Sequence, residues 1–324
     1  MARPVTSTRA DPQIGAALKR LDALIERAPD LAELAAFYRA VVPALHDAQA
    51  GVLPFVLDPE TAQRKLESGL PLLVGEDLPL DLATTRELFL RLCRTVESAP
   101  QPERSRASIF SRGRPDPLKL IEPAHDGNGA ALRSTAAGQI RRAVERNELD
   151  LAPVWEALAA GERQRMEAVA ASCQLDAGLL RLLAENSLKP ALRVWARALK
   201  AKVNLDHWRR GQCPMCGSAP ALAEIQGKDG ERRLRCGMCG ADWYYPRLQC
   251  VFCSNSDHRT LGALNVEGEE EKYRAQTCEK CRGYLKIVAT FDPTPVDQLA
   301  VEDLATLHLD LLAAERGYAR PPVR

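Results

Sequence analysis

Eight of the ten cysteines lie between residues 213 and 281, where they form four Cys-x-x-Cys pairs. Because only two residues separate the cysteines of a pair, one tight turn can direct both thiolates at the same ion, and two such turns complete a tetrahedral shell of four sulfurs. In chain order the spacing is C-x2-C-x19-C-x2-C and, ten residues later, C-x2-C-x24-C-x2-C. The pattern therefore predicts two separate metal sites. The first predicted site consists of Cys213, Cys216, Cys236 and Cys239, and the second of Cys250, Cys253, Cys278 and Cys281.

Disulfides and free redox thiols are the alternative uses of clustered cysteines. Disulfides form in oxidising compartments, and the first residues, MARPVTSTRADPQ, contain no apolar segment of the kind that exports a chain. A thioredoxin-like protein carries one CxxC where a strand enters a helix, whereas here four pairs alternate with hairpin signals. We therefore expect metal ligation in a cytoplasmic protein.

The spacing does not select the metal, because zinc and mononuclear iron both accept four thiolates. His207 and His258 flank the cluster, but eight thiolates already fill two shells, so we expect neither imidazole to bind metal. A structural zinc contributes roughly 10 to 16 kcal/mol to the folding of isolated fingers. Either ion would therefore stabilise a segment that contains few large apolar residues.

The residue directly after the second cysteine of each pair differs between the two predicted sites. Glycine adopts positive φ freely, which lets the turn direct amide N–H groups at the sulfurs and so tunes a redox potential. The first site has Gly217 and Gly240 at this position, and the second has Ser254 and Arg282. We therefore expect the first site to be the better candidate for electron transfer and the second to be structural.

Hairpins are predicted between the cysteine pairs. The segments ALAEIQ and ERRLR flank GKDG, which predicts a turn near Asp229 and Gly230. A strand is predicted at DWYYPRLQ, a second hairpin at TLGALNVEG and EEKYRAQT, and a last strand at GYLKIVAT. The cysteine-rich region therefore reads as two loose repeats, each a rubredoxin-like or zinc-ribbon unit, at residues 206–246 and 247–292.

Residues 1–205 predict an all-α domain, because apolar residues recur there every three or four positions. Asp11, Asp81 and Asp176 are expected to cap helices, and Pro190 to begin the last one. The periodicity lapses at residues 98–130, which predicts an irregular loop. Residues 293–324 predict a C-terminal helix and tail. The fold class is thus α+β, with a helical domain, two tandem metal-binding units and a C-terminal helix.

The remaining cysteines and the helical half carry no predicted chemistry. Cys93 and Cys173 lie on apolar helix faces, which favours small buried hydrophobes over ligands. The helical half contains no catalytic constellation, so we do not expect an enzyme. A composition of 46% hydrophobic and 27% charged residues, with no run of about eighteen apolar residues, predicts a soluble chain without membrane insertion.

The net charge of the chain indicates which class of partner it can bind. A divalent ion on four thiolates contributes −2, so two such sites bring the formal charge from +1 to −3. Residues 201–291 hold 14 Lys and Arg against 11 Asp and Glu before the thiolates are counted, which disfavours nucleic acid. A zinc-ribbon adaptor for nucleic acid or for another protein stays an alternative, as does a thiol–disulfide oxidoreductase with exposed, metal-free cysteines. The arginines that support an adaptor are Arg232, Arg233, Arg235 and Arg247, next to three aromatic residues, and we expect them to offset the anionic metal centres.

From about Cys213 to Arg320 the chain resembles the FdhE family of formate dehydrogenase accessory proteins. The resemblance rests on CPMCGSAP, DWYYPRLQCVFC, the CxxC-x2-YLKI ending and DLATLHLDLLAAERGYAR. It implies a cytoplasmic, non-catalytic maturation factor, or redox-type chaperone, with a rubredoxin-like site, and it favours iron over zinc. It also implies contact with the catalytic subunit of respiratory formate dehydrogenase during assembly. A homodimer is left open.

Overall fold

The computed structural model of the chain describes residues 11–98 and 129–321. The irregular loop predicted at residues 98–130 lies almost entirely outside these ranges. The described helices of the first 200 residues are α1 (Pro12–Arg27), α2 (Ala32–Ala48), α3 (Pro59–Glu67), α4 (Leu82–Glu97), α5 (Gly129–Glu145), α6 (Ala152–Ala160), α7 (Arg163–Ser172) and α8 (Ala177–Lys200). None of the helices in the described residues is long and apolar enough to cross a membrane.

Three helices begin where the sequence predicts. The carboxylates of Asp11, Asp81 and Asp176 each accept a hydrogen bond from a backbone N–H of the first turn, which satisfies donors that a helix N-terminus otherwise leaves unpaired. The predicted break at Pro190 is wrong, because α8 runs through it as one helix of 24 residues. Pro190 is buried in this helix, as are Leu188 and Ala191 beside it, so packing on both sides outweighs the lost hydrogen bond.

Cys93 and Cys173 belong to the helical core. Cys93 is fully buried in the cluster formed by α4, α5 and α8, and burial raises the pKa of its thiol to about 12. Cys173 is half-buried and packs against the same cluster. Both positions are far from the cysteine pairs in sequence, and neither joins a group of sulfurs among the described residues.

The two cysteine-rich units form one six-stranded sheet, with strand order β3-β2-β1-β6-β5-β4. The predicted hairpins are both present, as β1 with β2 and β4 with β5. The predicted strand at DWYYPRLQ is shorter than expected and ends at Tyr244. The units meet through β1 and β6, which pair in parallel from Ala223 opposite Ile287 to Gln226 opposite Thr290. The strands are β1 (Pro220–Gln226), β2 (Glu231–Cys236), β3 (Asp242–Tyr244), β4 (Leu261–Leu264), β5 (Tyr273–Cys278) and β6 (Tyr284–Thr290).

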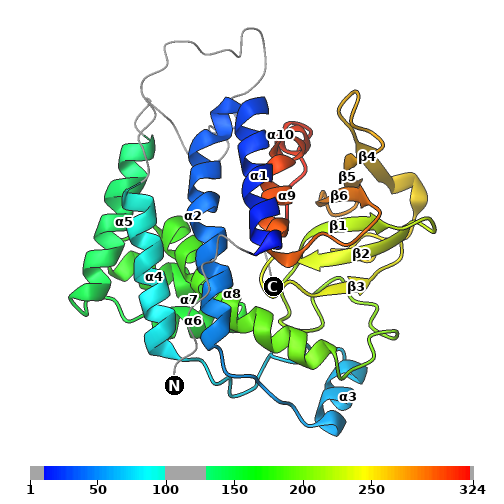
Figure 1. Ribbon diagram of the computed structural model, residues 1–324. Coiled ribbons are helices and arrows are strands. Elements are labelled where there is room, and N and C mark those ends of the chain that lie inside the picture. Colours follow the sequence, from blue (N-terminus) through cyan, green and yellow to red (C-terminus); the bar gives the residue numbers. More distant parts are fainter. Residues whose placement is uncertain (1–10, 99–128, 322–324) are drawn as a thin grey trace.

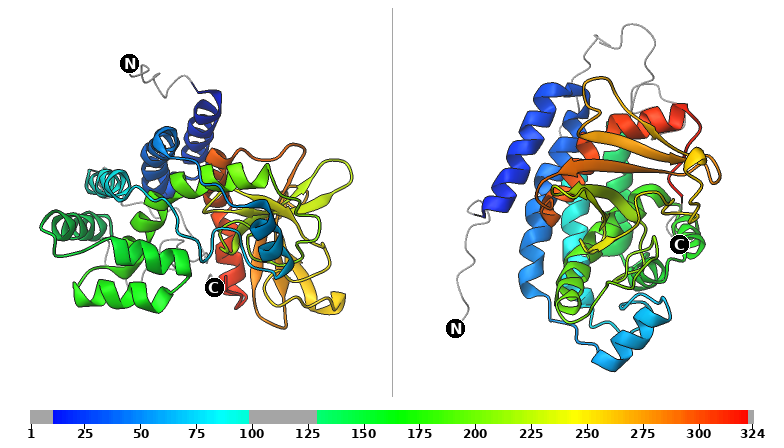
Figure 2. Two further views of the ribbon diagram at one scale, coloured as in Figure 1. Left: turned by 90° about the horizontal axis from the view of Figure 1, so that it is seen from below. Right: turned by 90° about the vertical axis from the view of Figure 1, so that its right-hand side faces the viewer.

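The helices and the sheet lie side by side, with the C-terminal helices between them (Figures 1 and 2). The predicted C-terminal helix is present as two, α9 (Leu299–Ala305) and α10 (Leu307–Glu315), which join at Thr306. They cover the sheet face that presents Tyr273 and Tyr284. The α+β class predicted from the sequence is confirmed.

The helical part and the first cysteine-rich unit share an apolar core. Trp195 and Leu199 of α8 pack in one cluster with Leu234, Trp243 and the cysteines of the first unit. A segment that precedes α4 also contacts this unit, since residues 72 and 73 donate backbone hydrogen bonds to the carbonyls of residues 214 and 215 at 2.9 and 2.8 Å. The first unit is therefore held by residues that lie about 20 to 140 positions earlier in the chain.

A buried ion pair connects β1 with β2. Arg235 donates to Glu224 at 2.6 Å, and the two side chains are 5% and 0% exposed. Both side chains also bind the backbone of the segment after β6. The N–H of Thr294 donates to the Glu224 carboxylate, and the carbonyl of Thr294 accepts a hydrogen bond from Arg235. Removing one partner would leave the other charge buried and uncompensated.

We expect Glu224→Gln to lower the free energy of unfolding by about 3–5 kcal/mol, because the Arg235 guanidinium loses its counter-charge in a dry site. Urea denaturation followed by circular dichroism measures the change. Glu231→Gln is the matched control, since Glu231 pairs with Arg233 at 3.2 Å with its side chain 46% exposed, and it should change stability by less than about 1 kcal/mol. Equal losses in the two variants would contradict the role of burial.

Candidate metal centres

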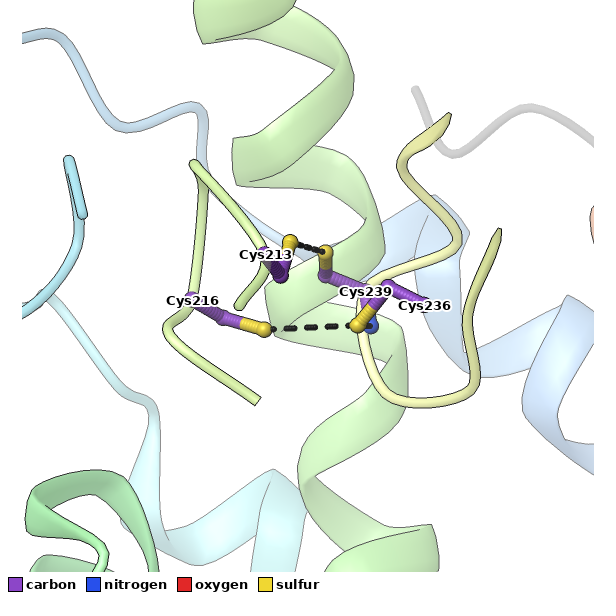
Figure 3. A group of neighbouring side chains, drawn as sticks. All are labelled: Cys213, Cys216, Cys236 and Cys239. Carbon is purple, nitrogen blue, oxygen red and sulfur yellow. Dashed lines mark hydrogen bonds between the residues drawn. The ribbon is translucent and has the colours of Figure 1, made fainter. Parts of the chain in front are cut away.

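The sulfurs of the first predicted site converge beside α8 (Figure 3). Cys213 Sγ lies 3.5 Å from Cys239 Sγ, and Cys216 Sγ lies 3.5 Å from Cys236 Sγ. The turn of residues 213–216 precedes β1, and Cys236 ends β2, so the first hairpin brings its two ends together. All four sulfurs lie within 4.8 Å of one another.

The second predicted site repeats this arrangement. Cys250 Sγ lies 3.7 Å from Cys281 Sγ, and Cys253 Sγ lies 3.7 Å from Cys278 Sγ. The turn of residues 250–253 precedes β4, and Cys278 ends β5. The structure thus brings the eight cysteines together in the two groups that their spacing predicts, and no histidine joins either group among the described residues.

The spacing of the sulfurs fits a tetrahedral ion. A metal–sulfur bond of about 2.3 Å places the sulfurs of a tetrahedron about 3.8 Å apart, close to the separations in both groups. A disulfide would require about 2.05 Å, and all eight cysteines are free. Each group of four cysteines could therefore bind one metal ion. The geometry does not distinguish iron from zinc.

All four cysteine pairs adopt one turn conformation. In each pair the N–H of the first cysteine donates to the carbonyl of the fifth residue after it, at 2.8–3.0 Å. The residue directly after the second cysteine has positive φ in every pair, with values of 78°, 75°, 57° and 55° at Gly217, Gly240, Ser254 and Arg282. The second unit therefore reaches the same turn without glycine. The two units differ in the conformational cost of the turn, which is about 1–2 kcal/mol for each residue with a side chain, and not in its shape.

Hydrogen bonds to sulfur occur in both groups. The N–H of Cys239 donates to Cys236 Sγ at 3.5 Å, and the side-chain amide of Asn255 donates to Cys278 Sγ at 3.6 Å. Ser218 Oγ lies 3.4 Å from Cys216 Sγ. The sequence interpretation missed Ser218 and Asn255. Both stand two positions after a CxxC, and a polar residue at that position is the signal that could have identified them.

Burial and hydrogen bonding shift the pKa values of the cysteines in both groups. Burial raises the pKa of Cys213 and Cys239 in the first group. In the second group burial also acts to raise the pKa of Cys278, but hydrogen bonds from the N–H groups of residues 281 and 280 and from Asn255 outweigh it and lower that pKa to about 7. The first group also contains a thiol of lowered pKa, because hydrogen bonds from the other cysteines lower the pKa of Cys216 well below its usual value. Each group therefore contains one cysteine that favours the thiolate.

Cations of α8 face the first group. Burial lowers the pKa of Lys189, to about 8, and that of Arg193, with a smaller opposing effect from the sulfurs of Cys236 and Cys239. Arg193 is 7% exposed and pairs with Asp297 at 2.6 Å, so its charge is already compensated. Lys189 is therefore the α8 cation that would offset part of the negative charge of a metal on four thiolates.

The ribbon arginines that the sequence assigned to this task are engaged elsewhere. Arg233 pairs with Asp242 at 2.6 Å, and Arg235 pairs with Glu224. Arg232 is 1% exposed and donates mainly to backbone carbonyls, although Cys250 is among the groups that act on its pKa. No pattern in the sequence predicted that positive charge near the first group would come from α8.

A cavity of about 410 Å³ lies where the helical part meets both cysteine-rich units. Met238, between Cys236 and Cys239, lines it from the first site, and Phe252, between Cys250 and Cys253, lines it from the second. Cationic side chains of α8 and of the C-terminal segment complete the wall. Those cations are Arg181, Lys189 and Arg320, and Glu185, which pairs with Arg181 at 2.6 Å, lines the cavity with them.

A helical domain joined to a sheet that carries two groups of four cysteines defines a protein with paired rubredoxin-like units. Residues 212–247 match the family model for the FdhE central domain, and residues 248–324 match that for the FdhE C-terminal domain. These two matches confirm the resemblance to the FdhE family that was predicted from the sequence.

Curated relatives share the cysteine-rich half. The chain is 36% identical over 148 residues to a protein FdhE homolog of Aquifex aeolicus, which covers 44% of this chain and 50% of that protein. It is 37% identical over 140 residues to a homolog of Pseudomonas aeruginosa, covering 41% and 45%. The chain thus spans about half the length of these relatives.

The full fold resembles a solved structure. The crystal structure of the FdhE protein from Pseudomonas aeruginosa matches 98% of this chain and 95% of its own, with a TM-score of 0.55 and 24% sequence identity. At this identity the match establishes the fold alone. It extends the similarity to the helical domain, which the family models do not cover.

We expect Gly240→Ala to lower the free energy of unfolding by more than about 1 kcal/mol, because the new Cβ would need positive φ and would lie 2.1 Å from Val296 Cγ2. Gly227→Ala is the control, since Gly227 has φ of 62° but open space around it. Thermal unfolding of the metal-loaded protein measures both. Equal losses would show that contact with Val296 adds nothing.

The opposite change tests the second unit. Ser254→Gly should raise the free energy of unfolding by up to about 1 kcal/mol, because glycine removes the strain of φ at 57° while adding some unfolded-state entropy. The same thermal measurement applies, with metal content determined in parallel. A loss of stability would indicate that the Ser254 side chain contributes more than its backbone costs.

Proposed function

We propose that the protein is a non-catalytic accessory factor for the assembly of respiratory formate dehydrogenase, and that it acts in the cytoplasm. The proposal includes two metal ions, each ligated by one group of four cysteines. The observation that carries it is the convergence of eight sulfurs into two tetrahedral groups within FdhE-family domains. The resemblance to that family favours iron.

The proposed mechanism assigns different tasks to the two sites. A metal–thiolate centre, when bound, supplies either a structural cross-link or one-electron chemistry. Lys189 would hold positive charge beside the first site, and α8 with residues 72 and 73 excludes water from it. In this proposal the first site keeps a thiol, selenol or metal centre of the catalytic subunit in the required redox state. The second site stabilises the sheet.

The cavity between the units is where we place the contact with the client. A segment bound there would touch Met238 and Phe252, each inside a CxxC turn of one site. Lys189 would favour an acidic side chain, since Arg181 already pairs with Glu185 in the lining, and the apolar wall would accept aliphatic side chains. The catalytic subunit would thereby lie one residue from the ligands of both sites.

The alternative functions have weaker support. A thiol–disulfide oxidoreductase needs accessible thiols of low pKa, and Cys216 and Cys278 do have lowered pKa values. Each of them, however, lies within 4.8 Å of the three other sulfurs of its group, which favours ligation of a shared ion. A nucleic-acid adaptor needs free arginines among the aromatic residues, yet Arg233 and Arg235 are paired with carboxylates and Arg232 is 1% exposed. Of the four arginines that support an adaptor, this leaves Arg247. A protein-binding adaptor is compatible with the accessory role.

Metal content tests the ligand assignment. Protein purified without oxygen should contain about two metal ions per chain, one for each group of sulfurs. We expect Cys213→Ser with Cys216→Ser to remove one ion, and Cys250→Ser with Cys253→Ser to remove the other. Visible spectra of the two double variants identify which site carries an iron–thiolate band. Retention of both ions by either variant would overturn the assignment.

Client binding is tested separately. A pull-down of the formate dehydrogenase catalytic subunit should recover it with the intact chain, and enzyme maturation should fall with the Cys213→Ser and Cys216→Ser variant. Cys173→Ser is the control, because Cys173 is half-buried outside both groups. Full maturation by the double variant would remove the first site from the mechanism, whereas no recovery by the intact chain would overturn the proposed partner.

A further inference from the structure

A second cavity, of about 310 Å³, lies on the sheet face that α9 and α10 leave open. Its floor contains Ile225 of β1 and Ile287 of β6, which the strand register places on the same face as Arg232 and Arg274. Tyr273 is next to Arg274 and points to the opposite face, against the C-terminal helices. We call this space the arginine cavity.

The polar lining of the arginine cavity has one sign of charge. Three guanidinium groups, those of Arg232, Arg247 and Arg274, line it together with the imidazole of His258. No aspartate or glutamate is among the described residues that line it. Arginines elsewhere on the sheet pair with carboxylates, as Arg235 does with Glu224.

Two of these guanidinium groups have N–H donors that are not used in hydrogen bonds with the described part of the chain. Arg274 forms no hydrogen bond or ion pair with the described part of the chain, and burial together with the charge of Arg247 lowers its pKa. Within residues 11–98 and 129–321, the Arg247 guanidinium donates only to the carbonyl of Gly230, at 3.4 Å. Two like charges thus share one concave surface with no carboxylate among its described lining residues, and a bound anion would reduce their repulsion.

Arg232 is part of the cavity wall, and its donors are used within the protein. Its side chain is 1% exposed and donates to the carbonyls of Tyr245 and Gln249, at 3.2 and 2.8 Å. Gln276, which accepts a hydrogen bond from Arg232, donates to the carbonyl of Arg247 at 3.0 Å. The connection between the two units is therefore fixed over the sheet, and Arg247 is held at the rim.

We propose that the arginine cavity binds a multiply charged oxyanion of the phosphate or diphosphate class. Guanidinium groups donate in a planar fork that matches phosphate oxygens, and a single carboxylate would compensate only one of the cations. The apolar floor strengthens these contacts by excluding water. The site is separate from both groups of cysteines, and the proposal does not depend on the client of the protein.

Isothermal titration of the metal-loaded full chain with sodium diphosphate tests the proposal. Saturable binding is expected, and Arg274→Gln and Arg247→Gln should each weaken it about tenfold or more, because each removes a charged hydrogen-bond donor. Arg259→Gln is the matched control, since Arg259 is in the same unit but pairs with Asp257 at 3.1 Å outside the cavity. It should leave the affinity unchanged. Circular dichroism and metal content confirm that the variants are folded.

Three outcomes would overturn the proposal. The first is no heat of binding with diphosphate at low ionic strength. The second is an equal loss of affinity in Arg259→Gln, which would indicate general charge attraction. The third is equally tight binding of malonate, a dicarboxylate, which would contradict the assignment to phosphate chemistry.

Discussion

Four thiolates that lie within 4.8 Å of one another repel unless a cation lies between them, and this constraint governs the cysteine-rich part of the chain. Each turn fixes its sulfurs through the same backbone hydrogen bonds, so the sulfurs are positioned before any ion is considered. At the first group Lys189 of α8 adds a positive charge close enough for the sulfur of Cys236 to raise its pKa, against the larger lowering by burial.

Short-range patterns predicted much of this architecture. Turn chemistry and cysteine spacing are local properties, so the two hairpins and the grouping of the sulfurs follow from residues within about 30 positions of one another. The family resemblance rested on the same segments. Ligation of metal by these sulfurs stays a proposal.

What the sequence did not predict depends on distant residues. The sequence around Ala223 and Ile287 does not predict that β1 and β6 pair, because packing across the whole sheet sets a parallel register. The continuity of α8 through Pro190 has the same origin, since buried neighbours on both sides override a local breaker. The α8 cations beside the first group and the unpaired arginines of the second cavity become visible only once strands and helices are placed.

The parallel pairing of β1 with β6 also sets an order of events during synthesis. The edge of β1 at residues 223–226 has its partner at residues 287–290, so it stays open until the ribosome has released more than sixty further residues. An open strand edge is a site where nascent chains associate wrongly. Until then β1 can pair with β2 on its other edge, so the hairpin that carries the first group of cysteines can form before the sheet is complete.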